Sequence, residues 1–228
     1  MMAVSKPTRH SQSRLLGAAL ALLFVALPPA YAAAQGQALE AKLSGRALID
    51  ALRGGGHVML MRHTATDSYV GDPGTLDLAD CATQRNLSET GRVQAEAIGR
   101  AIKTLGIPVG VVISSPYCRC VDTAKLAFGE TEVSPELTVG DGLAYEERAA
   151  RGAKIRKIVG AKPADGTNTV LVTHTGILLY TFGLQAKPEG ITHVFRHAEF
   201  GPALYVGAVL PGEWGPLAAE TAGAPAAP

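Results

Sequence analysis

The sequence has no run rich in lysine or arginine, its formal net charge is only +1, and aromatic residues make up just 5% of it. A nucleic-acid-binding surface needs clustered cations, and one that holds single strands also needs aromatic rings for stacking. The composition therefore gives no support to nucleic acid or to an anionic membrane surface as a partner. With 228 residues, of which 47% are hydrophobic, the chain is long enough to bury one sizeable core.

Several catalytic and cofactor motifs are also missing. The sequence contains no G-x-S-x-G, no phosphate-binding P-loop and no G-x-G-x-x-G, and its histidines and cysteines show no metal-ligand spacing. We therefore expect neither a metal nor a bound cofactor. The one alternative is a copper site on the expected strand that carries His57, Met59 and Met61, since histidine and methionine are copper ligands. Buried packing is the simpler interpretation of this strand.

No apolar run is long enough to span a bilayer comfortably. The longest, Leu15–Leu27, follows Lys6, Arg9 and Arg14 and precedes two prolines and a stretch of small residues. This order is typical of a secretory signal peptide, and an uncleaved anchor is the alternative. We expect residues 1–34 to be a signal peptide, and the mature protein to be periplasmic or secreted with no stable membrane anchor.

The remaining chain predicts one domain over residues 35–210 and a disordered tail rich in alanine and proline over 211–228. Short apolar runs alternate with segments of helical periodicity, which indicates an α/β fold with a mostly parallel sheet between two helical layers. Strands are expected at 58–61, 109–113, 132–137 and 169–173, and a hairpin at 193–200 and 203–210. Helices are expected at 44–53, 88–105, 117–128, 143–159 and 177–184.

Three of the expected parallel strands stop at polar residues. Arg62 and His63 follow the first, the turn from Ser114 to Arg119 follows the second, and His174 follows a third. Parallel strands bring their carboxyl ends to one edge of a sheet, where ligands bind. Two guanidinium groups and two imidazoles at that edge would form an anion site, and the arginine fork suits a phosphate.

The residues of these strand ends resemble a known family. The pattern R-H-T at 62–64, S-S-P-x-x-R-x-x-x-T-A at 114–124 and H-T-G at 174–176 is similar to that of the histidine phosphatase superfamily, which has the phosphoglycerate mutase-like fold. The resemblance implies that His63 is the nucleophile that becomes phosphorylated. It also implies that Arg62, Arg119 and His174 bind the phosphoryl oxygens, and that Thr64 and Thr66 lie in the loop around the phosphate.

The proton donor is implied less directly. Members of the mutase-like branch take a glutamate from the segment after the second motif, and this chain offers Glu146 and Glu147 there. A solvated helix face explains either residue equally well. Asp67, in the loop after the first motif, is a rival donor.

These residues predict an exported phosphomonoesterase that acts through a phosphohistidine on a small phosphorylated substrate. Phosphorylated sugars of the cell envelope are the first class to test, since the chain also resembles lipopolysaccharide core phosphatases. The alternative is a secreted anion-binding module of the same fold that lacks turnover. No oligomeric state is predicted.

The chain has only three cysteines, Cys81, Cys118 and Cys120. An oxidising compartment permits a disulfide, and we expect it to join Cys81 to Cys118, because both segments should meet above the strand ends. Two residues further along a helix, Cys120 would point well away and stay buried as a free thiol. Three reduced thiols are the alternative.

Overall fold

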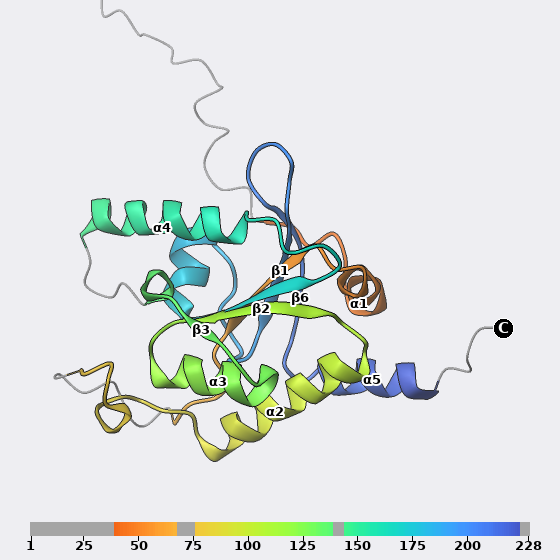
Figure 1. Cartoon of the computed structure of the whole chain (residues 1–228), viewed down its shortest axis with the longest axis horizontal. Coiled ribbons are helices and arrows are strands. Elements are labelled where there is room, and N and C mark those ends of the chain that lie inside the picture. The colour runs from red at the N-terminus through yellow and green to blue at the C-terminus, as the bar shows by residue number, and fades with distance from the viewer. Residues whose placement is uncertain (1–38, 68–75, 139–143, 224–228) are drawn as a thin grey trace, which may run out of the picture. The chain divides into compact units, whose positions relative to one another are not determined.

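The computed structural model describes residues 39–67, 76–138 and 144–223. The expected signal peptide, residues 1–34, lies outside them. The elements of the fold alternate as the sequence predicts (Figure 1). In chain order they are α1 (Gly45–Arg53), β1 (His57–Arg62), η2 (Cys81–Thr83), α2 (Glu89–Thr104), β2 (Val109–Ser114), α3 (Cys118–Phe128), β3 (Glu132–Val133), η3 (Pro135–Leu137), α4 (Tyr145–Val159), β4 (Asn168–Thr173), η4 (Ile177–Thr181), β5 (Thr192–Arg196), β6 (Leu204–Val209) and α5 (Trp214–Gly223).

The six strands form one sheet in the order β3-β2-β4-β1-β5-β6. The pairs β2–β3, β2–β4 and β1–β4 are parallel, whereas β5 pairs antiparallel with both β1 and β6. The sheet is therefore mostly parallel, as predicted, and the hairpin of β5 and β6 closes one side of it. β2, β4 and β1 are neighbours, so their carboxyl ends lie side by side.

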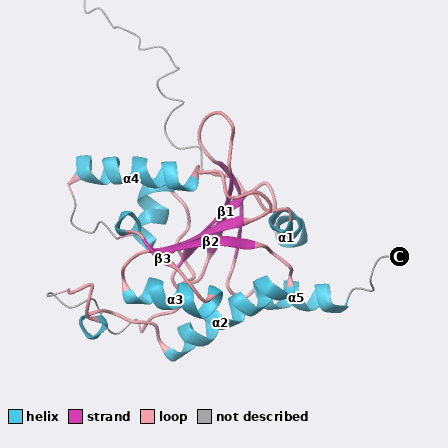
Figure 2. Cartoon of the chain, in the orientation of Figure 1, coloured by secondary structure: helices cyan, strands magenta, loops and turns pink. Residues whose placement is uncertain are grey.

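Helices cover both faces of this sheet. In Figure 2, α4 lies on one side of the strands and α2, α3 and α5 lie on the other. Each face has its own apolar cluster: one joins the sheet to α1, α2, α3 and α5, and the other joins it to α4 and η4. The three-layer sandwich predicted from the sequence is confirmed.

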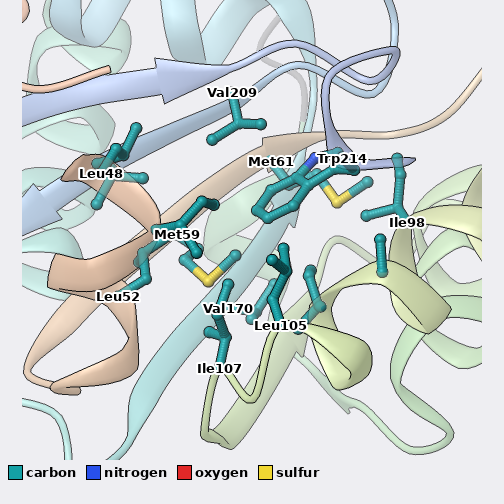
Figure 3. Packing of buried hydrophobic residues seen from close by; sticks show 14 of the residues in the cluster. Leu48, Leu52, Met59, Met61, Ile98, Leu105, Ile107, Val170, Val209 and Trp214 are labelled. Carbon is teal, nitrogen blue, oxygen red and sulfur yellow. The ribbon is translucent and has the colours of Figure 1, made fainter. Parts of the chain in front are cut away.

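Strand β1 is buried along its whole length and contributes to both clusters. Met59 and Met61 point into the first cluster, while Val58 and Leu60 point into the second. A continuous apolar run is what a central parallel strand with helices on both faces requires. The two methionines therefore pack in the core, where Figure 3 shows them with Leu52, Val170 and Trp214.

The prediction of a disordered tail over residues 211–228 is wrong for most of its length. Trp214 begins helix α5, which continues to Gly223, and the Trp214 side chain is only 1% exposed. An aromatic ring of this size buries a large apolar area, and alanine has the highest helix propensity, so the segment folds onto the core despite its low complexity. The domain therefore extends beyond residue 210.

Smaller differences concern exposure and length. Val93 on α2 is 53% exposed, because the buried face of this helix is formed by Gly91, Ala95, Ile98, Ala101 and Ile102. The strand expected at 132–137 is only two residues long, since Pro135 begins a 3₁₀ turn. The helix expected after His174 is a short π-helical turn.

Helix α2 supports the loop that follows β1. Ser88 caps the helix by accepting a hydrogen bond from Gly91 N, and Ser88 N donates to Ala65 O. A Cβ atom on Gly91 would lie 1.8 Å from Ala65 O, so only glycine lets the loop approach this closely. The residues directly after His63 are thus fixed against the first turn of α2. Among the described residues, no helix has the length and apolarity needed to cross a membrane.

Candidate active site

The carboxyl ends of β1, β2 and β4 bring the three predicted motifs together. The backbone N–H of His63, just beyond β1, donates to Thr173 O at the end of β4 (3.0 Å). Ser115 N, just beyond β2, donates to Val172 O, also at 3.0 Å. The imidazoles of His63 and His174 then meet edge to face, with their ring centroids 5.6 Å apart. Sequence-distant residues therefore share one buried site because their strands are neighbours.

The ring of His63 is held in one tautomer. Its Nδ1 lies 2.9 Å from Thr64 O, and a carbonyl oxygen can only accept a hydrogen bond. Nδ1 must therefore carry the proton, which leaves the lone pair on Nε2. The side chain is only 2% exposed, so its contacts and its tautomer are both fixed by the surrounding protein. This arrangement leaves Nε2 as the ring nitrogen with a free lone pair.

The site keeps His63 neutral. Burial, which penalises the charged ring, lowers its pKa to about 3, and the positive charges of Arg119, Arg62 and Arg85 act in the same direction. The hydrogen bond to Thr64 opposes this change but does not cancel it. A neutral imidazole has the free lone pair that attack on phosphorus requires.

The second histidine, His174, is equally enclosed. Its Nε2 lies 2.8 Å from Ser115 Oγ, and the ring of Tyr117 packs against it edge to face at 4.9 Å. Burial lowers its pKa well below the usual 6.5, and His63 and the nearby arginines lower it further. The Sγ atom of Cys120 lies 3.5 Å from the same Nε2. An anion entering the site would offset the burial of both rings by favouring their protonated forms.

Arg62 contacts the segment between η4 and β5. Its Nη1 donates to Ala186 O and its Nη2 to Glu189 Oε1, both at 2.7 Å. Its Nε is buried and, among the described residues, has no hydrogen-bond acceptor. A buried guanidinium N–H without an acceptor is costly, and an oxyanion bound beside His63 would satisfy it.

Arg119 comes from the first turn of α3. Its guanidinium stacks on the Tyr117 ring, 4.3 Å from the centroid, and Nη1 lies 3.4 Å from Arg85 O. The side chain is buried, and its charge lowers the pKa of both histidines. The structure thus brings Arg62, His63, Arg119 and His174 into one positively charged site. The N-terminus of α3 adds its partial positive charge to this site.

The two threonines of the first loop bind protein groups. Thr64 N and Thr64 Oγ1 each lie 3.1 Å from Thr123 Oγ1, on α3. Thr66 N donates to Glu189 Oε2 (2.9 Å), and Thr66 Oγ1 donates to Glu189 Oε1 (3.1 Å). Both side chains therefore hold the loop in place, and the phosphate contact implied by the resemblance stays a prediction.

The predicted disulfide is confirmed. Cys81 is bonded to Cys118, with their Cα atoms 5.7 Å apart, and Cys120 is a buried free thiol, as expected. Burial raises the pKa of the Cys120 thiol to about 12, so it stays protonated. Gln84 reinforces the link, because its Oε1 accepts a hydrogen bond from Cys118 N (2.9 Å). The loop before α2 is thus attached directly to the first turn of α3, beside Arg119.

The candidate proton donors lie on the surface. Glu146 and Glu147 are exposed in the first turn of α4, and Glu147 lines a groove of about 400 Å³ together with Glu136, Arg151 and Lys154. Asp67 is exposed as well. No hydrogen bond or ion pair in the described part of the chain joins either glutamate to His63 or His174.

Two charged residues of the site were not predicted from the sequence. Arg85 lies in the loop before α2, and Glu189 lies in the segment between η4 and β5. The disulfide between Cys81 and Cys118 could have indicated Arg85, because it brings that loop to Arg119. Nothing in the local sequence indicates Glu189, which stands between Pro188 and Gly190. Among the residues with described positions, no group of three or more histidine, cysteine or acidic side chains could hold a metal ion.

Part of the chain matches the model of a known family. Residues 58–144 match the family model of the histidine phosphatase superfamily (branch 1). They include the first two motifs, and the resemblance predicted from the sequence is confirmed. No curated protein matches the chain.

Three solved structures are similar to this fold. A protein proposed to be an alpha-ribazole-5'-P phosphatase, from Escherichia coli K-12, is 16% identical; the match covers 67% of this chain and 96% of the other, with a TM-score of 0.51. Rv3214 from Mycobacterium tuberculosis is 21% identical, with coverage of 68% and 96% and a TM-score of 0.49. Phosphoserine phosphatase from Entamoeba histolytica is 16% identical, with coverage of 69% and 98% and a TM-score of 0.48. The first of these confirms the phosphoglycerate mutase-like fold.

Proposed function

We propose that this histidine phosphatase superfamily chain is an exported, metal-independent phosphomonoesterase with a phosphohistidine intermediate. The observation that supports this most directly is the state of His63: its Nδ1–H is bound to Thr64 O, which leaves a neutral Nε2 beside Arg62, Arg119 and His174. A neutral nucleophile among cationic donors is the combination that transfer of a phosphoryl dianion needs.

In the first step, Nε2 of His63 attacks the phosphorus atom. A P–N bond forms while the P–O bond to the leaving group breaks, and the electron pair of that bond remains on the departing oxygen. A general acid protonates this oxygen. Arg62 and Arg119 hold the equatorial phosphoryl oxygens, and His174 lies beside them as a further donor.

In the second step, a water oxygen attacks the phosphohistidine. The P–N bond breaks, its electron pair returns to Nε2, and inorganic phosphate leaves. The group that served as acid now takes the proton from water. Throughout both steps, Thr64 O keeps Nδ1 protonated and so keeps the reacting nitrogen the same.

The general acid is proposed to be Glu146 or Glu147, on the basis of the family resemblance. A general acid matters most when the departing alkoxide is basic, so its loss should slow hydrolysis of a sugar phosphate far more than that of an aryl phosphate. We expect Glu146→Gln and Glu147→Gln to differ sharply in this ratio. If both match the parent on sugar phosphates, Asp67 is the next residue to change.

The proposed substrates are small phosphate esters outside the cytoplasm, and phosphorylated envelope sugars are the first to test. The pattern of residues 1–34 and the disulfide between Cys81 and Cys118 support export, since disulfides form in oxidising compartments.

The deciding experiment is to incubate the purified protein with an aryl phosphate, with and without a chelator. Turnover that survives the chelator supports the proposal. If no phosphate ester is hydrolysed at any pH while inorganic phosphate still binds, the protein is an anion-binding module of the same fold.

A further inference from the structure

We infer that Glu189 is a positioning residue of this site, which holds Arg62 and the loop after His63 and balances the charge that develops on His63; the role rests on the proposed function. Its carboxylate accepts three hydrogen bonds, from Arg62 Nη2, Thr66 N and Thr66 Oγ1, at 2.7, 2.9 and 3.1 Å. Its side chain is 22% exposed. Arg62 and Thr66 thus supply all three of these donors, one from a guanidinium, one from the backbone and one from a hydroxyl group.

The bond to Glu189 fixes how Arg62 faces the site. Ala186 O accepts a hydrogen bond from Nη1 and Glu189 accepts one from Nη2, so the guanidinium group is fixed at both of its terminal nitrogens. The buried Nε is left as the donor without an acceptor among the described residues. A guanidinium held in this way has already lost the rotamer freedom that binding would otherwise cost, so it is ready for an oxyanion.

Glu189 lies on the side of His63 that faces away from the reacting nitrogen. Its Oε1 is 3.9 Å from Nδ1, whereas the lone pair is on Nε2, across the ring. It is therefore badly placed to protonate a leaving group, which departs on the Nε2 side. When Nε2 bonds to phosphorus while Nδ1 keeps its proton, the ring becomes cationic. A carboxylate close to Nδ1 stabilises that charge.

The backbone on both sides of Glu189 is attached to the same strand end. Gly190 N donates to His63 O (3.0 Å), and Arg62 N donates to Ile191 O (3.0 Å). Gly190 has a φ of +87°, and a Cβ atom there would lie 3.1 Å from Gln94 Oε1, which itself accepts from Ala65 N. The carboxylate thus has a set position relative to both Arg62 and His63, although it is more than 120 residues away in sequence.

The two effects of Glu189 can be separated by two substitutions. Glu189→Gln removes the charge but keeps an oxygen that can accept from Arg62 and from Thr66 Oγ1. Glu189→Ala removes both the charge and the acceptor. A difference between the two variants therefore measures the hold on Arg62, and a difference between Glu189→Gln and the parent measures the charge.

Binding of inorganic phosphate, measured by calorimetry, tests the hold without any need for turnover. A negative charge near an anion site repels phosphate, so Glu189→Gln should bind it at least as tightly as the parent does. Glu189→Ala should bind it about 10-fold more weakly than Glu189→Gln, because the guanidinium is no longer held. Equal affinities for the two variants would overturn the positioning role, whether or not the protein turns over any ester.

Single-turnover formation of the phosphoenzyme from an aryl phosphate tests the charge. We expect Glu189→Gln to form it ~10- to 100-fold more slowly than the parent, the range found when groups that orient a site are removed. An unchanged rate would overturn the charge-balancing role of Glu189, but the proposed phosphatase function would still stand. A parent that forms no phosphoenzyme would contradict the proposed function itself. Glu96→Gln, which changes an exposed ion pair with Arg100 on α2, is the matched control and should alter neither quantity.

Discussion

The two sides of the site differ in how they are built. On one side, His63 follows β1, Arg119 lies in the first turn of α3 after β2, and His174 follows β4; all three lie within recognisable motifs. On the other side, the segment from Ala186 to Ile191 contributes carbonyl oxygens, backbone N–H groups and one carboxylate, and it carries no motif.

We call the first set of residues the reacting side, because the proposed reaction takes place there. We call the segment from Ala186 to Ile191 the supporting side, because its groups hold Arg62 and the end of β1 in place. In the proposed reaction, the arginine and histidine side chains at the strand ends contact the phosphoryl group, so they are restricted in type and in position. A carbonyl oxygen that orients Arg62 can come from any residue, since every backbone unit has one. In the described segment from Ala186 to Ile191, Glu189 is the residue that acts on Arg62 through its side chain.

The largest effect is expected on the reacting side. His63→Ala should abolish turnover and the acid-labile phosphoenzyme, with a loss of at least about 10⁴-fold, because no other group replaces the nucleophile. His57→Ala is the matched control, since His57 lies at the other end of β1, where its Nδ1 is bound to Gly55 O. A phosphoenzyme that persists in the His63 variant would mean that another residue is the nucleophile, and the proposed division into a reacting and a supporting side would be wrong.

Arg62 ends β1 on the reacting side, but its guanidinium is bound by Ala186 and Glu189 of the supporting side. Its replacement therefore tests how far the reacting side depends on the supporting side. Arg62→Lys keeps the charge but loses the planar fork, in which Nη1 and Nη2 bind Ala186 O and Glu189 while Nε is a separate donor; an ammonium has all its donors on one nitrogen. We expect steady-state kcat/KM to fall ~10²- to 10³-fold, the cost of losing one preorganised oxyanion donor. Arg100→Lys, at an exposed ion pair on α2, should leave it unchanged. If Arg62→Lys were equally harmless, charge alone would suffice and the supporting segment would have no role.

The disulfide attaches the loop before α2 to the first turn of α3, next to Arg119 on the reacting side. Replacing Cys81 and Cys118 with alanine opens a loop whose ends are 37 residues apart. In the chain-entropy model this lowers the free energy of unfolding by about 3 to 4 kcal/mol. Denaturant unfolding at neutral pH measures the loss, and a reductant should reproduce it in the parent without affecting the double variant. A difference below about 1 kcal/mol would mean that Gln84 and its neighbours hold the loop by themselves.

A further effect on stability concerns pH. Burial lowers the pKa of His63 to about 3 and that of His174 well below 6.5, whereas in the unfolded chain both take up protons near 6.5. The unfolded state therefore binds more protons below pH 6.5, and the free energy of unfolding falls as the pH drops from 6.5 towards 3. The slope is about 1.4 kcal/mol per pH unit for each histidine once it is protonated in the unfolded chain.

The matched variant for this prediction is His63→Asn, which cannot titrate in this range. Its free energy of unfolding should depend less steeply on pH than that of the parent between about pH 6 and 4, by the contribution of one proton. Urea unfolding at several pH values gives both slopes. Equal slopes would mean that His63 is protonated in the folded protein.

The grouping of Arg62, His63, Arg119 and His174 could be predicted from the sequence for a physical reason. A strand that must be buried on both faces reads as an unbroken apolar run, so Arg62 and His63 stand out at its end. The same reasoning located His174, and the meeting of two loops above the strand ends predicted the bond between Cys81 and Cys118.

The supporting side could not be predicted in this way. Glu189 follows a cis Lys187–Pro188 bond in a segment without periodicity, and its position depends on how β5 pairs with β1. Composition was equally uninformative for α5, where one tryptophan decides that an alanine-rich segment is ordered. Long-range pairing and the burial of a single large side chain are properties of the assembled fold, and no local pattern contains them.

The most direct test of the account is the site of phosphorylation itself. The parent protein is mixed with an aryl phosphate, quenched in base, in which phosphohistidine is stable, and examined by peptide mass spectrometry and ³¹P NMR. Because Thr64 O holds the proton on Nδ1, the phosphoryl group should be found on Nε2 of His63. Phosphate on Nδ1, on His174 or on any other residue would contradict the account.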